Sequence, residues 1–144
     1  MKANEYPRRI DWNQRLHAYV ISVRDKEFEY GVHDCCTFAA GCVEAVLGID
    51  PMAEFREQYH SLEQGNEALQ TIGDGDLFRT LHKVLGPSLP GAGGHKGDVA
   101  FFDCACGIVI GRVAMFISEK GYSVVLLSKL QRIFRVGNGE VTSG

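Results

Sequence analysis

The spacing of apolar positions divides the chain into a helical first half and a strand-rich second half. Up to residue 86, apolar residues recur every three or four positions, which is the period of a helix with one buried face. From residue 97 onwards, short runs rich in Val, Ile and Phe are separated by turn residues, which is typical of β-strands. The predicted helices span residues 12–24, 35–47, 51–58, 61–72 and 73–86, and the predicted strands span residues 98–103, 107–111, 112–117, 122–127 and 132–136.

Several helix boundaries carry capping signals. Asp34 is a predicted N-cap, and Gly48 is a predicted stop for the same helix. Asp50-Pro51 repeats the start signal, because proline suits the first helical turn. Ser61 with Gln64 resembles a capping box. In the second half, Lys120-Gly121 predicts a hairpin turn.

The order of these elements predicts one α+β domain over residues 1–144. A Pro/Gly-rich loop separates the helical half, about 10–86, from the strand-rich half, about 97–136. Helices followed by a strand meander pack on one face of an antiparallel sheet. The segment "YPRR" before the first helix is expected to be solvated, and the polar C-terminal tail after Val136 is expected to be frayed.

Composition narrows the functional classes. A net charge of -3 gives no reason to expect nucleic-acid binding. The N-terminus lacks the apolar run of a signal peptide, and the apolar region 99–117 is interrupted by Asp103 and Arg112, so no membrane span is expected. Five cysteines, two of them adjacent, disfavour a disulfide framework and favour reduced thiols or metal ligation.

Cys35 is the candidate nucleophile. It opens the predicted helix 35–47, where the unpaired backbone N–H groups and the helix dipole favour a thiolate. Asp34 partly opposes this, because a neighbouring carboxylate disfavours a second negative charge. A cysteine nucleophile also needs a base, usually histidine, from elsewhere in the fold.

The stretch "HDCCTFAAGCV", followed by "GDVAFF" and "GIVIG", resembles the NlpC-type branch of papain-like cell-wall peptidases. The whole layout, including "RIFRV" near the end, also resembles a group of phage tail-assembly proteins related to those peptidases. The resemblance implies a papain-like fold in which Cys35 would be the nucleophile of a thioester mechanism. The matching residues are Asp34, Cys35, Phe38, Gly97, Asp98, Gly107, Ile108 and Gly111.

The sequence departs from this family at the position of its base. Where the family has histidine, this chain has Ala105, and Cys36 and Thr37 replace a small Ser-Gly pair. His33 lies two residues from Cys35 but is poorly placed to face its thiol. His95 is expected at the other end of the strand hairpin, roughly 20 Å from the base position. His17, His60 and His82 have no pairing signal.

A second cysteine pair suggests another chemistry. Cys104 and Cys106 flank Ala105 at the end of the sheet expected to face Cys35 and Cys36. Four converging thiolates would suit zinc or an iron–sulfur cluster, although the spacing matches no common ligand pattern. Packing as small apolar residues is the competing interpretation. Cys42, on the apolar stripe of its helix, is expected in the core.

These observations leave three functional hypotheses. The resemblance favours a virion component, made in the host cytoplasm, of a phage tail tip or tail-assembly complex on a degenerate cysteine-peptidase scaffold. It implies distal tail or hub proteins as partners, and no cofactor. The first alternative is an active cysteine amidase or endopeptidase that cleaves peptidoglycan as the phage genome enters the cell. The second is a domain with a cysteine-ligated zinc or iron–sulfur site.

Overall fold

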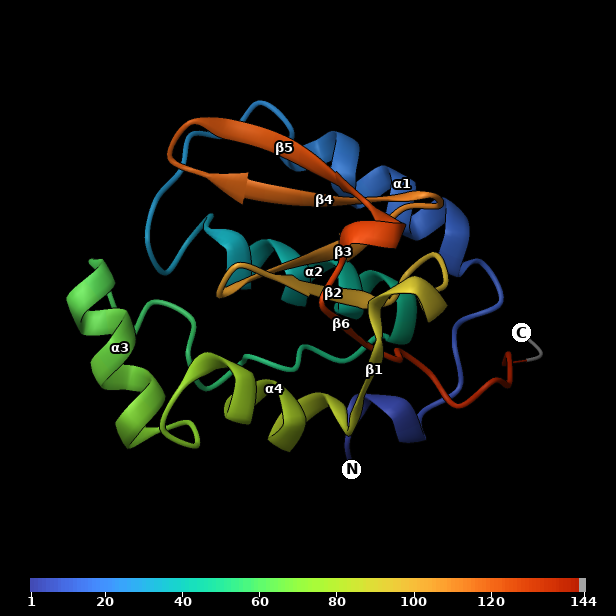
Figure 1. The fold of residues 1–144 in the computed structure, drawn as a ribbon, viewed down its shortest axis with the longest axis horizontal. Helices are drawn as coiled ribbons and strands as arrows, with labels where there is room; N and C mark the ends of the chain where they lie inside the picture. Colours follow the sequence, from blue (N-terminus) through green and yellow to red (C-terminus); the bar gives the residue numbers. More distant parts are fainter. Residues whose placement is uncertain (143–144) are drawn as a thin grey trace.

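The computed structural model describes residues 1–142 and confirms an α+β fold (Figure 1). In this part of the chain, four α-helices precede the six strands of one antiparallel sheet. The α-helices are α1 (Trp12–Val23), α2 (Cys35–Leu47), α3 (Leu62–Thr71) and α4 (Leu77–Leu85). The strands are β1 (Ser88–Pro90), β2 (Val99–Phe102), β3 (Ala105–Val109), β4 (Val113–Ser118), β5 (Gly121–Leu126) and β6 (Arg132–Phe134). Short 3-10 helices are η1 (Ala3–Glu5), η2 (Gly91–Gly93) and η3 (Leu127–Lys129).

Helix α2 is the buried centre of the fold and has the predicted boundaries. The Asp34 side chain accepts a hydrogen bond from the backbone N–H of Thr37, which satisfies one free donor of the first turn. Gly48 ends the helix with a left-handed φ of 85° and donates to the carbonyl of Glu44. Because both signals are local, the sequence was sufficient to place this helix.

The predicted helix at residues 51–58 is wrong, because residues 51–57 form successive turns. The Asp50 carboxylate accepts from the backbone N–H of Met52 and pairs with the Arg56 guanidinium, with Arg56 Nε 2.5 Å from Asp50 Oδ2. The turns of residues 51–57 are therefore held by the ion pair between Asp50 and Arg56. Met52 and Phe55 are buried beside α2 and α3.

The sheet runs in the order β1-β6-β2-β3-β4-β5. Strands β2 to β5 form consecutive hairpins, and β6 returns to pair with β2. Strand β1 was not predicted, because its three residues lie in the Pro/Gly-rich loop and pair only with β6. The predicted hairpin turn between β4 and β5 is present, one residue earlier, at Glu119-Lys120.

The two faces of the sheet have separate cores. One face packs against α1, α2 and α4, with Ile108 and Phe134 among its fully buried residues. The other face carries a smaller cluster beside η2 and η3. Helices therefore cover one face of the sheet, as expected. The smaller cluster consists of Ala100, Val109, Ala114, Phe116, Leu130 and Ile133.

Both ends of the chain are held by hydrogen bonds. The Arg8 guanidinium donates to the carbonyls of Val136 and Lys96 and pairs with Asp98, so the expectation that "YPRR" is solvated was wrong. Arg8 also pairs through its backbone with Glu140 and Thr142. The prediction of a frayed tail was therefore wrong for residues 137–142, and residues 143–144 lie outside the described part. Within residues 1–142, no helix combines the length and apolar character needed to cross a lipid bilayer.

Candidate functional site

The first turn of α2 is held rigidly at Asp34. Its Oδ1 accepts from the Thr37 N–H at 2.8 Å, and its Oδ2 accepts from the Gly31 N–H at 2.8 Å and from the Tyr59 hydroxyl at 2.5 Å. The Thr37 hydroxyl in turn accepts from the Asp34 N–H at 2.7 Å. A carboxylate with three donors is stabilised in place. This network fixes the backbone that carries Cys35.

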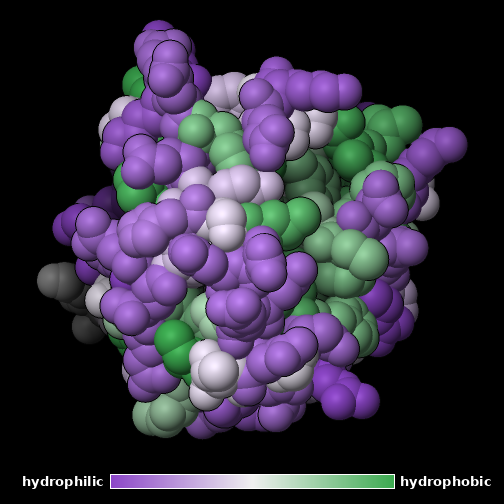
Figure 2. Space-filling view, turned by 90° about the vertical axis from the view of Figure 1, so that its left-hand side faces the viewer, coloured by the Kyte–Doolittle hydropathy of each residue, from purple (hydrophilic) through white to green (hydrophobic). Residues whose placement is uncertain are grey.

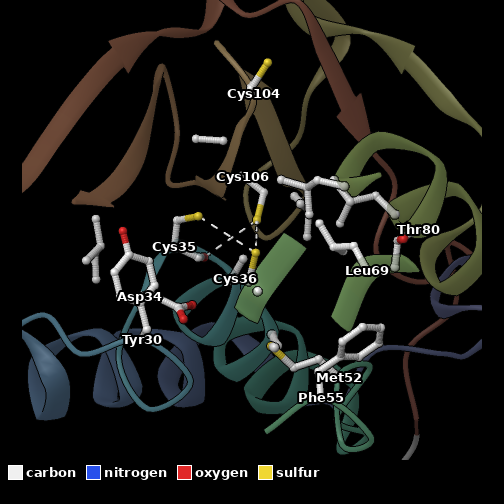
Figure 3. A pocket seen from close by; sticks show the side chains of 18 of the residues that line it. Tyr30, Asp34, Cys35, Cys36, Met52, Phe55, Leu69, Thr80, Cys104 and Cys106 are labelled. Atoms are coloured by element: carbon white, nitrogen blue, oxygen red, sulfur yellow. Dashed lines mark hydrogen bonds between the residues drawn. The ribbon is translucent and has the colours of Figure 1, made fainter. Parts of the chain in front are cut away.

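Three thiols meet where α2 packs on β3. The sulfur of Cys36 lies 3.8 Å from that of Cys35 and 3.8 Å from that of Cys106 (Figure 3). All three sulfur atoms lie within 4.8 Å of one another. Cys106 is buried, whereas Cys35 and Cys36 are half-buried. Pairing of Cys106 with Phe101 on β2 sets its position in the sheet.

Cys104 does not join this group, contrary to the prediction of four converging thiols. Asp103 and Cys104 form the two-residue turn between β2 and β3, with φ of 50° and 60°. This left-handed pair makes a tight hairpin and leaves Cys104 exposed. In Figure 3 its sulfur points away from the other three.

Ala105 is the residue that the sequence resemblance aligns with a histidine base. It packs beside the smaller cluster on the far face of the sheet, while the next residue, Cys106, belongs to the core shared with α2. Side chains alternate along a strand, so only one of these neighbours can face the helix. Cys106 is therefore the β3 residue that meets Cys35.

Imidazole groups are absent from the cleft beside Cys35. All five histidines lie in the described part of the chain, and none lines this cleft. His33 is buried on another side of α2, with its ring edge-on to Phe38, and burial lowers its pKa. His95 lies before β2, where its backbone N–H donates to Asp98. The structure thus brings no imidazole to the candidate nucleophile.

The three thiols do not share protons evenly. Hydrogen bonding by Cys106, and then by Cys36, holds the pKa of the Cys35 thiol well below its usual value, against the effect of burial. The pKa values of Cys36 and Cys106 are raised, chiefly by their hydrogen bonds within the same group. Negative charge is therefore favoured on Cys35 alone. Cys42, deep in the core, has a pKa raised by burial and takes no part.

Cys35 and Cys106 line an apolar cleft of about 550 Å³. Its walls come from α2, α3 and α4, from the turns of the β2–β3 and β4–β5 hairpins, and from the segment before α2. Figure 2 faces this side of the molecule and shows apolar side chains in a hollow bordered by hydrophilic ones. At the border, the Tyr30 hydroxyl donates to Glu119 Oε1 at 3.1 Å. The apolar wall residues include Phe28, Val43, Met52, Phe55, Leu69 and Leu81.

Two features of the site were beyond sequence analysis. Tyr59, which buttresses Asp34, lies 25 residues away in an irregular segment without a recognisable motif. The separation of Cys104 from Cys106 depends on the hairpin register, which spacing alone does not give.

The fold and the site define a class of protein: a single α+β domain with a low-pKa thiol at the start of a buried helix, facing an antiparallel sheet across an apolar cleft. Residues 7–136 match a family model, and the chain belongs to that family, described as Domain of unknown function (DUF6950). The matched range contains all five cysteines, Arg8 and Asp98. No curated protein and no solved structure matches the chain.

Proposed function

We propose that this chain is a structural component of a phage tail tip or tail-assembly complex, on a papain-like scaffold of the NlpC type that has lost its chemistry. One observation carries the loss of chemistry: the neighbours of the Cys35 thiol are two further thiols and no imidazole. A cysteine peptidase needs a base to generate its thiolate and an acid to protonate the leaving amine. Cys36 and Cys106, with raised pKa values, stay protonated at neutral pH and therefore cannot accept a proton.

The arrangement of elements supports the scaffold assignment. Cys35 begins a helix that packs on the sheet, Gly97-Asp98 opens β2, and Gly107 of β3 lies close against Met115 and Phe116 of the neighbouring strand β4. These are the places that the resemblance gives to the same motifs. The resemblance to phage tail-assembly proteins supports the role in a virion.

The cleft supports a binding role in place of a catalytic one. Its apolar walls and hydrophilic border have the composition of a protein-binding surface. A volume of about 550 Å³ holds a few side chains of a bound segment. In this proposal the segment belongs to a neighbouring tail protein of the distal tail or hub.

The test is the protein content of purified phage particles. Quantitative mass spectrometry of complete virions should find the chain at a fixed copy number relative to the major tail protein. Virions that carry Cys35→Ser should remain infective, because the scaffold needs no thiol chemistry. Consistent absence from particles and from tail-assembly intermediates would refute the structural role.

A second candidate, a cysteine amidase or endopeptidase acting on peptidoglycan, is favoured by one observation. Cys35 has a lowered pKa and opens into a cleft at a helix N-terminus. Purified protein incubated with peptidoglycan would then release new amino groups, and Cys35→Ser would abolish the release. Equal, background release by both forms would eliminate this candidate.

A further inference from the structure

We infer that Cys35, Cys36 and Cys106 form a binding site for a single thiophilic d¹⁰ cation, Zn²⁺ or Cu⁺. The inference does not rest on the proposed function, since it concerns what the three sulfur atoms bind. Three thiols from two different elements meet at one point of the fold, with all pairs of sulfur atoms within 4.8 Å.

The sulfur spacing fits one ion. A zinc–thiolate bond of about 2.3 Å in a tetrahedron places two ligand sulfurs about 3.8 Å apart. Cys36 lies 3.8 Å from Cys35 and 3.8 Å from Cys106. A trigonal Cu⁺ site has nearly the same edge, so distance selects a single soft ion without choosing between the two metals. A [4Fe–4S] cluster binds each thiolate to a different iron, which requires more widely separated sulfurs, and a [2Fe–2S] cluster needs two protein ligands on each of its two irons, one more than the three thiols supply.

The ligands are held in position before any ion arrives. The Asp34 network fixes the first turn of α2, and the pairing of Cys106 with Phe101 fixes β3. Asp34 itself is not a ligand, because its two oxygens are occupied by three hydrogen bonds. Thiolates are the ligands that Zn²⁺ and Cu⁺ prefer.

Charge at the site is compatible with a cation. The free backbone N–H groups of a helix N-terminus carry partial positive charge, which stabilises one thiolate at Cys35 but not three. Thiols bind a cation as thiolates, so binding releases their protons. Cys35 and Cys106 line the cleft, so a fourth position on the ion would face the cleft. A site with three protein ligands and one open position can accept a group from whatever occupies the cleft.

The test is metal binding by the reduced, metal-free protein without oxygen. For Zn²⁺, Co²⁺ serves as the spectroscopic substitute. For Cu⁺, the ion itself is titrated in competition with a chromophoric chelator. We expect one ion per chain, with thiolate-to-cobalt charge-transfer absorption. Cys106→Ser should weaken binding by more than about 100-fold, because even changes outside the ligand shell cost 10–100-fold. Cys104→Ser is the matched control, since that thiol lies outside the group.

A second measurement needs no variant. Alkylation of the native protein, mapped by mass spectrometry, should be blocked by Zn²⁺ or Cu⁺ at the half-buried Cys35 but not at the exposed Cys104. The metal that blocks alkylation at the lower free concentration is the one that the site prefers. Substoichiometric binding, equal affinity of the Cys104→Ser and Cys106→Ser variants, or uniform alkylation with and without metal would each overturn the inference.

Discussion

Arg8 and Asp98 form an ion pair across 90 positions of the chain, with Arg8 Nη2 3.3 Å from a carboxylate that is fully buried. Arg135 binds the same carboxylate from the C-terminal side, and the Val136 N–H donates to it at 3.0 Å. The Gly-Asp pair that opens β2 is therefore a structural junction between the two ends of the chain and the sheet. Gly97, with φ of 93°, lies against the Arg8 guanidinium, where a Cβ atom would come within 2.9 Å of Nη1.

Removal of the Asp98 carboxylate should destabilise the protein strongly. Asp98→Ala leaves two guanidinium groups without their shared anion, and breaking a buried pair costs about 3–5 kcal/mol in the free energy of unfolding. Urea denaturation followed by the fluorescence of Trp12, the single tryptophan, measures the loss. Asp11→Ala, which breaks an exposed pair with Arg15, should leave the midpoint unchanged. Similar effects of the two substitutions would contradict the junction.

Alkylation of Cys35 should show an unusually low pH midpoint. Because hydrogen bonding by Cys106 and Cys36 lowers its pKa, the reactive thiolate persists at pH values where a free thiol, with a pKa of about 8.5, is protonated. Cys106→Ala removes the larger cause and should move the midpoint to higher pH. Rates of iodoacetamide modification at Cys35, read by peptide mass spectrometry from pH 5 to about 9, measure both. A wild-type profile matching that of N-acetylcysteine would refute this assignment.

The Tyr59–Asp34 hydrogen bond should contribute measurably to stability. Tyr59→Phe removes a donor to a buried carboxylate, and hydrogen bonds to charged groups contribute about 1.5–3 kcal/mol. Thermal unfolding of the variant should therefore occur at a lower temperature. Tyr30→Phe is the matched control, because its hydroxyl bonds to Glu119 at the surface. If the control loses as much stability as Tyr59→Phe, burial of the first bond is not the cause.

Gly107 should tolerate no side chain. A Cβ atom there would lie 2.3 Å from the carbonyl oxygen of Met115 and 2.8 Å from the Phe116 ring. Gly107→Ala should cost about 1–3 kcal/mol, as overpacked positions do. Gly93→Ala, where a Cβ meets nothing within 4 Å, should be near neutral in the same chemical denaturation experiment. Near-equal stability of the two variants would show that β3 and β4 can separate without cost.

The sequence predicted the parts of the fold that local chemistry determines. Helix α2 was placed correctly because Asp34 and Gly48 cap it through bonds to their own neighbours. The segment after Asp50 was misassigned because its ion pair with Arg56 overrides the start signal. Strand β1 was missed because it exists only through pairing with β6.

In the candidate site, too, the sequence predicted what local chemistry determines and missed what depends on distant residues. Cys35 at a helix start was readable from sequence, and the structure places it there. The sequence alone could not predict which cysteine of the sheet faces Cys35. Cys106 faces it because Asp103-Cys104 form a tight turn and side chains alternate along β3. Arg8 was misjudged because its partner, Asp98, is distant in sequence.

The ion pairs of Arg8 and Arg135 with Asp98 limit how far the chain can be shortened at either end. Shortening it to the helices and strands alone would remove Arg8 and leave a charged carboxylate facing an apolar interior. Figure 1 shows the red segment that follows β6 and leads to residue 142 on the opposite side of the molecule from α3, which lines the cleft. An affinity tag or fluorescent protein attached beyond this segment would therefore extend from the side of the molecule away from α3, so that labelled chains can report on what enters the cleft.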